Sequence, residues 1–200
     1  LLPQMTHLVN LLKVMIYNSC MGKKRLVLPL SMALVLLTVF CFMVVRTVSG
    51  IQKHEPLSVR VTKVHDGDSV SILYRGREER VRLIGIDAPE MGQKPWGRKA
   101  KKHLEEILNH TGWMTILEFD IQERDQYGRL LAYLWTRDKK LINLEMLKDG
   151  FAVLYTIPPN VKYVETLRNG EQSARENSLG IWGRDGLREV PREYRKEHHH

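Results

Sequence analysis

The chain has 200 residues, 43% hydrophobic and 27% charged, which excludes both a pair of large domains and a disordered chain. Its formal net charge is +8, but residues 1–50 hold five basic residues and no acidic ones, so residues 51–200 carry only +3. Such a mildly basic domain does not establish a nucleic-acid partner by its total charge. Any inference of that kind must rest on the positions of particular arginines.

The two cysteines, Cys20 and Cys41, both precede the polar part of the chain. The region after residue 50 therefore has no internal disulfide and no thiolate metal site. It must fold on its hydrophobic core alone.

A targeting segment is predicted over residues 21–50. A basic head at 23–25 precedes a nearly unbroken apolar run at 26–45. About twenty residues at about 1.5 Å each span about 30 Å, the thickness of a bilayer core. The pattern fits a cleaved signal peptide or an uncleaved transmembrane anchor, and the basic flank predicts that the rest of the chain is exported. Residues 1–20 are interpreted as a non-native or upstream extension.

Residues 51–187 are expected to form one domain that is rich in short strands. Turn signals at Asp66-Gly67-Asp68 and at Arg75-Gly76-Arg77 separate the first strands, and Pro89 ends the third. Alternating or β-branched segments predict five strands, at 57–64, 70–74, 80–86, 113–119 and 130–135.

Three helices are predicted around these strands. The first begins near Pro95, the second covers 141–148 and ends at Gly150, and the third covers about 160–177. The apolar face of the first helix consists of Trp96, Ala100, Leu104, Ile107 and Leu108. Three strands, a helix and two strands follow the order of an OB-type barrel. We therefore expect an α+β fold, mainly a five-stranded OB-fold barrel with three helices, preceded by the apolar segment and followed by a polar tail at 188–200.

Three charged clusters could support chemistry, although each alone has an ordinary interpretation. His65-Asp66-Gly67-Asp68-Ser69 is a carboxylate-rich turn that also fits an Asx turn between two strands. The turn at 124–129 brings Arg129 to the start of a strand, and it also fits a hairpin with exposed charge.

The third cluster lies at 82–90. Arg82 alternates with apolar neighbours, so its side chain should project from the opposite face to Leu83, either into solvent or into the barrel, where it would need carboxylate partners. Asp87 and Glu90 flank Pro89 and could hold a hard cation and a water. Together the clusters supply carboxylates for a hard cation and guanidinium groups for a phosphate, which is the inventory of phosphoryl chemistry.

Four motifs recur together in the order of a known family. They are VHDGDSV at 64–70, VRLIGIDAPE at 81–90, DQYGRLLAY at 125–133 and NSLGIWG at 177–183. With them, residues 58–183 resemble the staphylococcal nuclease (thermonuclease) family. The resemblance implies a calcium-dependent nuclease that acts on DNA or RNA and leaves 3′-phosphate ends.

The resemblance also implies a ligand set for calcium. Asp68 and Asp87 would bind the ion through their carboxylates, and Ala88 would bind it through its backbone carbonyl. The family usually has threonine at the position of Ala88, but a main-chain ligand tolerates this change. Asp66 would support the turn near the metal.

The same resemblance assigns roles in catalysis. Glu90 would be the general base that acts on water, whereas Arg82 and Arg129 would hold the scissile phosphate from two sides. Tyr155 falls near the base-stacking tyrosines of the family, and a core or rim position also fits it. The chain departs from the family in a shorter segment at 91–96 and in Gln126, which stands where a lysine is common.

Two other classes of function remain open at this point. The domain could be a non-catalytic OB-fold module that binds single-stranded nucleic acid or a protein, or an anchored structural domain. The presence of all five charged site residues favours the enzyme. We expect a nucleic-acid substrate, membrane contact through the apolar segment if it is uncleaved, no obligate protein partner and a monomer that is secreted or anchored outside the cytoplasm.

Overall fold

The structure is a computed structural model that describes residues 38–40, 42 and 57–198. The expected signal or anchor segment lies almost entirely outside these residues. Among the described residues, no helix has both the length and the apolar character needed to cross a membrane.

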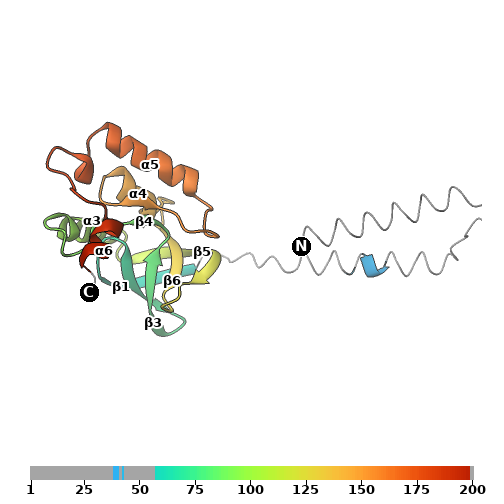
Figure 1. Cartoon of the computed structure of the whole chain (residues 1–200). Helices are drawn as coiled ribbons and strands as arrows, with labels where there is room; N and C mark the ends of the chain where they lie inside the picture. Colours follow the sequence, from blue (N-terminus) through green and yellow to red (C-terminus); the bar gives the residue numbers. More distant parts are fainter. Residues whose placement is uncertain (1–37, 41, 43–56, 199–200) are drawn as a thin grey trace, which may run out of the picture. The chain divides into compact units, whose positions relative to one another are not determined.

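The part from Leu57 onward forms a barrel with helices around it (Figure 1). Its elements are β1 (Leu57–Val64), β2 (Ser69–Tyr74), β3 (Arg77–Leu83), β4 (Gly85–Asp87), α3 (Trp96–His110), β5 (Met114–Arg124), β6 (Leu130–Trp135), α4 (Ile142–Lys148), β7 (Val153–Tyr155), α5 (Val164–Glu176), the 3₁₀ turn η1 (Gly180–Trp182) and α6 (Pro191–His198).

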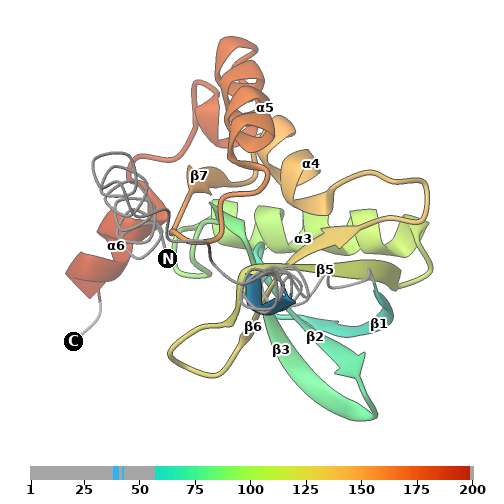
Figure 2. The same cartoon turned by 90° about the vertical axis from the view of Figure 1, so that its right-hand side faces the viewer.

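Five strands close into a barrel in the order β1-β2-β3-β6-β5, which confirms the predicted five-stranded barrel with helices. The pairing of β3 with β6 is parallel and the other pairings are antiparallel. Helices α3, α4 and α5 lie on one side of the barrel (Figure 2). The predicted apolar face of α3 packs on the core through Ala100, Leu104 and Leu108, all fully buried.

The predicted strand at 80–86 divides into two elements, so its predicted end was wrong. Gly85 has φ +81°, and a Cβ at this residue would lie 2.3 Å from Cδ1 of Leu167. This backbone conformation favours glycine because other residues rarely adopt it. The chain therefore leaves the barrel after β3, and β4 pairs with β7 in a separate two-stranded sheet.

The last predicted helix also begins later than expected, at Val164. The reason is tertiary: the Asn160 side chain accepts a hydrogen bond from the Gln122 backbone N–H and donates one to the Gln122 carbonyl. These bonds hold the loop against β5 in a non-helical conformation.

The segment at 188–200 is not merely a polar tail, because it contains the helix α6. The part of the chain from residue 57 to residue 198 thus has four α-helices rather than the three expected. The side chain of Pro191 at the start of α6 is buried, while most of the remaining helix is exposed.

A buried amide joins α4 to the point where β3 ends. Asn143 is fully buried, and its side chain accepts a hydrogen bond from the Leu134 N–H and donates one to the carbonyl of Ile84. Without the Asn143 side chain, the Leu134 N–H and the Ile84 carbonyl would lose these hydrogen-bond partners. Asn143 thereby holds the start of β4 beside β6.

We predict that Asn143→Leu lowers the free energy of unfolding by about 2–4 kcal/mol, because it leaves two buried backbone groups without partners. Urea denaturation followed by circular dichroism measures this change. Lys148→Ala, an exposed substitution on the same helix, is the control and should change stability by less than about 0.5 kcal/mol. Equal effects of the two substitutions would contradict the structural role of Asn143.

Candidate active site

The turn between β1 and β2 places Asp66 and Asp68 in different directions. The carboxylate of Asp66 accepts hydrogen bonds from the Asp68 N–H (3.0 Å) and from the Ser69 hydroxyl (2.7 Å), so the Asx-turn interpretation is correct for Asp66. Asp68 instead reaches across the chain, where its Oδ2 accepts a hydrogen bond from the Ala88 N–H at 2.6 Å.

A tight contact keeps this turn beside the segment that follows β4. A Cβ added at Gly67 would lie 2.6 Å from the Ala88 Cβ and 2.7 Å from the Ala100 Cβ. The small residues therefore allow the turn, the end of β4 and helix α3 to approach closely. This packing brings Asp68 to Asp87 and Ala88.

Arg82 projects from the outer face of the barrel, because its neighbours Val81 and Leu83 are buried in the interior. The alternative in which its guanidinium lies inside the barrel is therefore wrong. The side chain is nevertheless only 14% exposed, since the chain after β3 folds over it.

The guanidinium of Arg82 is surrounded by acceptors. Nη1 donates to the carbonyls of Leu83 and Ile86, each at 2.8 Å. Nη2 lies 3.1 Å from Asp87 Oδ1 and 3.2 Å from Asp68 Oδ2. Two carboxylates from distant parts of the chain thus converge on a single nitrogen of Arg82.

Asp87 and Glu90 lie on either side of the chain break at Pro89, as expected, but they differ in exposure. The Asp87 side chain is 1% exposed and that of Glu90 is 35% exposed. The Gln93 side chain accepts a hydrogen bond from the Glu90 N–H and donates one to the carbonyl of Glu189. The loop that carries Glu90 is thereby attached to the segment just before α6.

Arg195 joins this cluster from α6, although no motif in the sequence pointed to it. Its Nη2 lies 2.9 Å from Asp87 Oδ2, and its Nη1 lies 3.0 Å from Asp87 Oδ1 and 2.6 Å from Glu90 Oε1. A proline followed by seven residues without glycine or proline was the sequence signal for a helix here. That signal shows no partner for Arg195, because its partners lie about a hundred residues earlier.

Arg129 stands immediately before β6, and its side chain has a carboxylate of its own turn as its partner. Asp125 accepts hydrogen bonds from the N–H groups of Tyr127 and Arg129, both at 2.9 Å, and from Arg129 Nε at 2.7 Å. Arg82 pairs with Leu131 across β3 and β6. Because side chains alternate along a strand, Arg129, two residues before Leu131, faces the same side as Arg82.

Tyr155 lies in the small sheet that carries Asp87. In that sheet Gly85 pairs with Tyr155 and Asp87 pairs with Val153. Alternation therefore places the half-buried Tyr155 on the same face as Asp87, two residue pairs along the sheet. A position at the rim of the site fits Tyr155 better than a position in the core.

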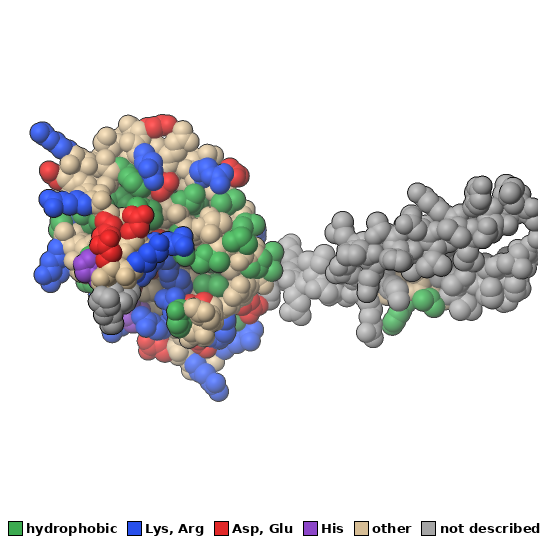
Figure 3. Space-filling model, viewed as in Figure 1, with side chains coloured by type: hydrophobic (Ala, Val, Ile, Leu, Met, Phe, Trp, Pro, Cys, Tyr) green, Lys and Arg blue, Asp and Glu red, His purple; other side chains and the backbone are tan. Residues whose placement is uncertain are grey.

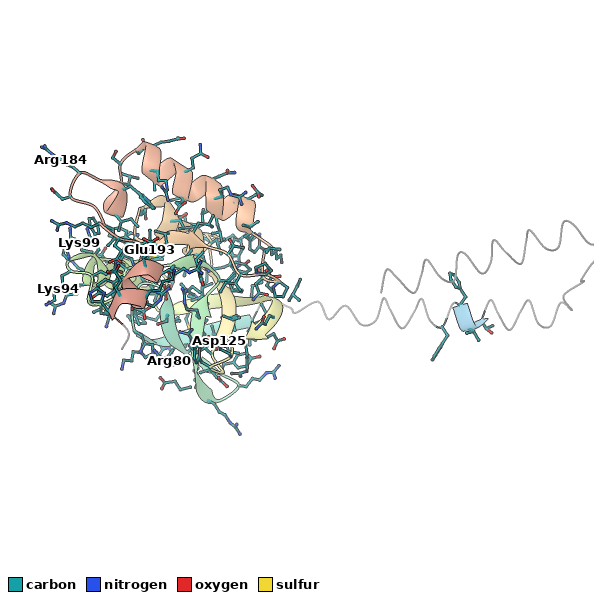
Figure 4. All side chains as sticks on the ribbon, in the orientation of Figure 1. Arg80, Lys94, Lys99, Asp125, Arg184 and Glu193 are labelled. Carbon is teal, nitrogen blue, oxygen red and sulfur yellow. The ribbon has the colours of Figure 1, made fainter. Side chains whose placement is uncertain are left out.

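The face of the molecule that carries α6 shows acidic and basic side chains side by side (Figure 3). Figure 4 shows Glu193 on α6, with Arg80 and Asp125 on the barrel part of the same view. Because Asp68, Asp87 and Glu90 meet Arg82 and Arg195, opposite charges nearly balance within this cluster.

The oxygen donors at this cluster suit a hard cation. Within residues 57–198 and the few described before them, no three His, Cys, Asp or Glu side chains are grouped to hold a metal ion. A cation at Asp68 and Asp87 would therefore also need backbone and water oxygens, which calcium accepts more readily than other common metals. The residues present fit calcium in the type of donor.

Burial strongly affects the protonation of Asp68. Removal from water raises the pKa of its carboxyl to about 7, although the nearby Arg82 guanidinium acts in the opposite direction. The ordinary value for aspartate is 3.8. The folded metal-free protein therefore holds a proton on Asp68 more tightly than the unfolded chain does.

A pH-dependent loss of stability follows from this raised pKa. The proton on Asp68 stabilises the folded state fully below about pH 4, and this stabilisation is lost as the pH rises towards about 7. In a chelating buffer, the free energy of unfolding of the natural chain relative to Asp68→Asn should fall between these two pH values and then level off. Denaturant titrations of both proteins at several pH values test this, and a constant difference would contradict it.

Comparison with known proteins supports the family resemblance that the sequence motifs indicate. The model of the family described as "Staphylococcal nuclease homologue" matches residues 80–184. Endonuclease YncB of Bacillus subtilis is 37% identical over 137 residues, 65% of this chain and 64% of the relative. The SPbeta prophage-derived endonuclease YokF of Bacillus subtilis is 38% identical over 139 residues, 66% of this chain and 46% of the relative. The thermonuclease of Staphylococcus intermedius is 38% identical over 136 residues, 64% of this chain and 77% of the relative.

The chain thus spans 64% of YncB and less than half of YokF, but more than three quarters of the staphylococcal thermonuclease. The region that the family model matches covers more than half of the chain and includes the end of β3, all of β5 and β6, and the residues from Arg82 to Arg129. This chain therefore belongs to the family of staphylococcal nuclease homologues.

Proposed function

We propose that this chain is a calcium-dependent nuclease that hydrolyses phosphodiester bonds of DNA or RNA and leaves 3′-phosphate ends. The observation that carries the proposal is the convergence of Asp68, Arg82, Asp87 and Glu90 from distant positions in one cluster. Three relatives named as endonucleases or a thermonuclease support the same class of reaction.

Calcium would be held by the carboxylates of Asp68 and Asp87 and by the backbone carbonyl of Ala88, and when bound it supplies charge stabilisation and an acidified water. We assign the role of general base to Glu90, and its exposure, the largest among the carboxylates of the cluster, supports this role. Glu90 takes the proton of the attacking water.

The two arginines act on the phosphate. Arg82 and Arg129 face the same side of neighbouring strands, and their guanidinium groups donate to the non-bridging oxygens, where charge increases during attack. The new bond forms between phosphorus and the water oxygen, and the bond between phosphorus and the 5′ oxygen breaks. The 5′ oxygen leaves while a hydrogen bond from Arg129 stabilises its negative charge, it takes a proton from solvent to become a hydroxyl, and the phosphate stays on the 3′ side.

Tyr155 is the proposed contact for a base of the substrate. Its place on the same face of the small sheet as Asp87 supports this role. Base stacking on an aromatic side chain contributes about 1–3 kcal/mol per base and tolerates any sequence, which fits a nuclease with little sequence preference.

The central test is cleavage of single-stranded DNA by the purified chain in calcium or in chelator. We expect cleavage only in calcium, and we expect Glu90→Gln to lower kcat by at least about 10², because the general base is lost. Fluorescence from a quenched oligonucleotide measures the rate. If the products have 3′-phosphate ends, a polymerase extends them only after phosphatase treatment.

Glu78→Gln is the matched control because Glu78 is an exposed glutamate on β3, and it should cleave at the natural rate. Full activity of Glu90→Gln would remove Glu90 from the mechanism. Calcium-dependent binding of DNA without cleavage, by the natural chain and by a variant that lacks Arg195, would instead favour the non-catalytic OB-fold module.

Arg129→Ala should lower kcat by about 10²–10³, because it removes a charged donor from the transition state. Arg129→Ala is easier to interpret than Arg82→Ala, because removal of Arg82 would also take its partner guanidinium from the buried Asp68 and one of two from Asp87. Steady-state kinetics on the same oligonucleotide measure the loss.

Arg137→Ala removes the same charge beyond the other end of β6, at an exposed position, and should leave kcat unchanged. If both substitutions lower kcat equally, Arg129 contributes only to the general positive charge of the surface. A thermal melt of each variant verifies that it is folded.

A further inference from the structure

Arg195 occupies the carboxylate group from which the proposed function starts. Both carboxylate oxygens of Asp87 accept hydrogen bonds from it, at 2.9 and 3.0 Å, and Glu90 accepts a third at 2.6 Å. Helix α6 lies over this part of the domain, as Figure 1 shows in red. The contact is well formed, because a guanidinium bound to two oxygens of one carboxylate is the strong geometry for such a pair.

This position is incompatible with a metal ion on the same oxygens. Oδ1 of Asp87 already lies 3.1 Å from Arg82, and Oδ2 lies against Arg195. A calcium ion would need to approach these oxygens to about 2.3–2.6 Å, and it would repel a guanidinium held there. The contact also occupies Oε1 of Glu90, so this oxygen is not free to accept a hydrogen bond from the attacking water while Arg195 is docked.

The docking of α6 on the domain is weak enough for the helix to detach and dock again. The helix has eight residues, of which only Pro191 is buried, and a helix of this length is marginal without tertiary contacts. Besides Arg195, Tyr194 of this helix lies against the loop at Gly92, where an added Cβ would lie 2.4 Å from the tyrosine oxygen.

The connections that hold the preceding segment are separate from α6 itself. Gln93 donates to the carbonyl of Glu189, and Trp96 Nε1 donates to the carbonyl of Asp185 at 3.2 Å. Val190 packs on the small cluster around Trp96. The helix can therefore leave the site while residues 185–190 stay in place and the barrel remains folded.

We propose that α6 is an autoinhibitory element, in which the Arg195 guanidinium occupies the oxygens of Asp87, a ligand of the proposed calcium ion, and also binds Glu90, and must withdraw before calcium and substrate bind. This inference rests on the proposed nuclease function. Calcium and the helix then compete for Asp87, so that calcium binding releases α6 and exposes Glu90.

The first experiment compares calcium affinity in the natural chain, Arg195→Gln and Arg192→Gln. Arg192 is exposed on the same helix and provides the matched control for the loss of charge. Isothermal titration with calcium should show about tenfold tighter binding by Arg195→Gln, the factor expected if the docked helix occupies about nine tenths of the natural molecules. The control should bind as the natural chain does. Cleavage at limiting calcium should be faster for Arg195→Gln.

A second variant and a second measurement test the proposal independently if Arg195→Gln does not fold. Tyr194→Ala weakens the docking of α6 without touching the carboxylates, and it should shift calcium affinity in the same direction by a smaller factor. In the natural chain, calcium should also increase hydrogen exchange of the amides of α6 while leaving those of the barrel strands protected.

Three outcomes would overturn the proposal. Equal calcium affinity of Arg195→Gln and the natural chain, with normal cleavage by both, would reject autoinhibition and leave the nuclease function intact. Unchanged affinity with slower cleavage would instead make Arg195 part of the substrate site. If no variant binds calcium or cleaves DNA, then the proposed function and this inference both fail.

Discussion

Asp87 is almost completely removed from water, and a carboxylate in that position is stable as an anion only beside positive charge. Two arginines supply this charge, Arg82 from the barrel and Arg195 from the C-terminal helix. Each of them also contacts a second carboxylate, Asp68 or Glu90 respectively. Because the five side chains share their partners, a change in any one of them alters the charge balance of the whole cluster. This coupling links the stability of the site to its ability to bind a cation.

The barrel determines where this cluster forms. Arg82 has a fixed position because β3 pairs with β2 on one side and with β6 on the other. Immediately afterwards, the left-handed conformation of Gly85 directs the chain out of the barrel, and Asn143 holds the departing segment. Asp87 therefore lies over the outer face of β3, where it can reach the arginine. A continuous strand through residue 86 would have carried Asp87 past that position.

Helix α6 brings a second guanidinium group to a site where the proposed reaction uses a metal cation. An arginine and a hard cation satisfy the same buried carboxylate, but only the cation leaves coordination positions for water and phosphate. The docked Arg195 thus supplies positive charge to Asp87 and Glu90. In the proposed mechanism, the C-terminal segment would regulate the site by direct competition with calcium, without any change in the barrel itself.

The sequence by itself determined the features that arise from neighbouring residues. Alternation predicted the barrel strands, helical periodicity predicted the buried face around Leu104, and Asp66 followed its Asx-turn pattern, because these features depend on partners a few residues away. The family motifs identified Asp68, Arg82 and Glu90 as candidate site residues. Only the tertiary structure decided that Arg82 faces outward under a folded-over chain and that Arg195 reaches Asp87, about a hundred residues earlier. Local patterns contain no information about such pairs, since the energy of a buried ion pair depends on which distant groups the fold brings together.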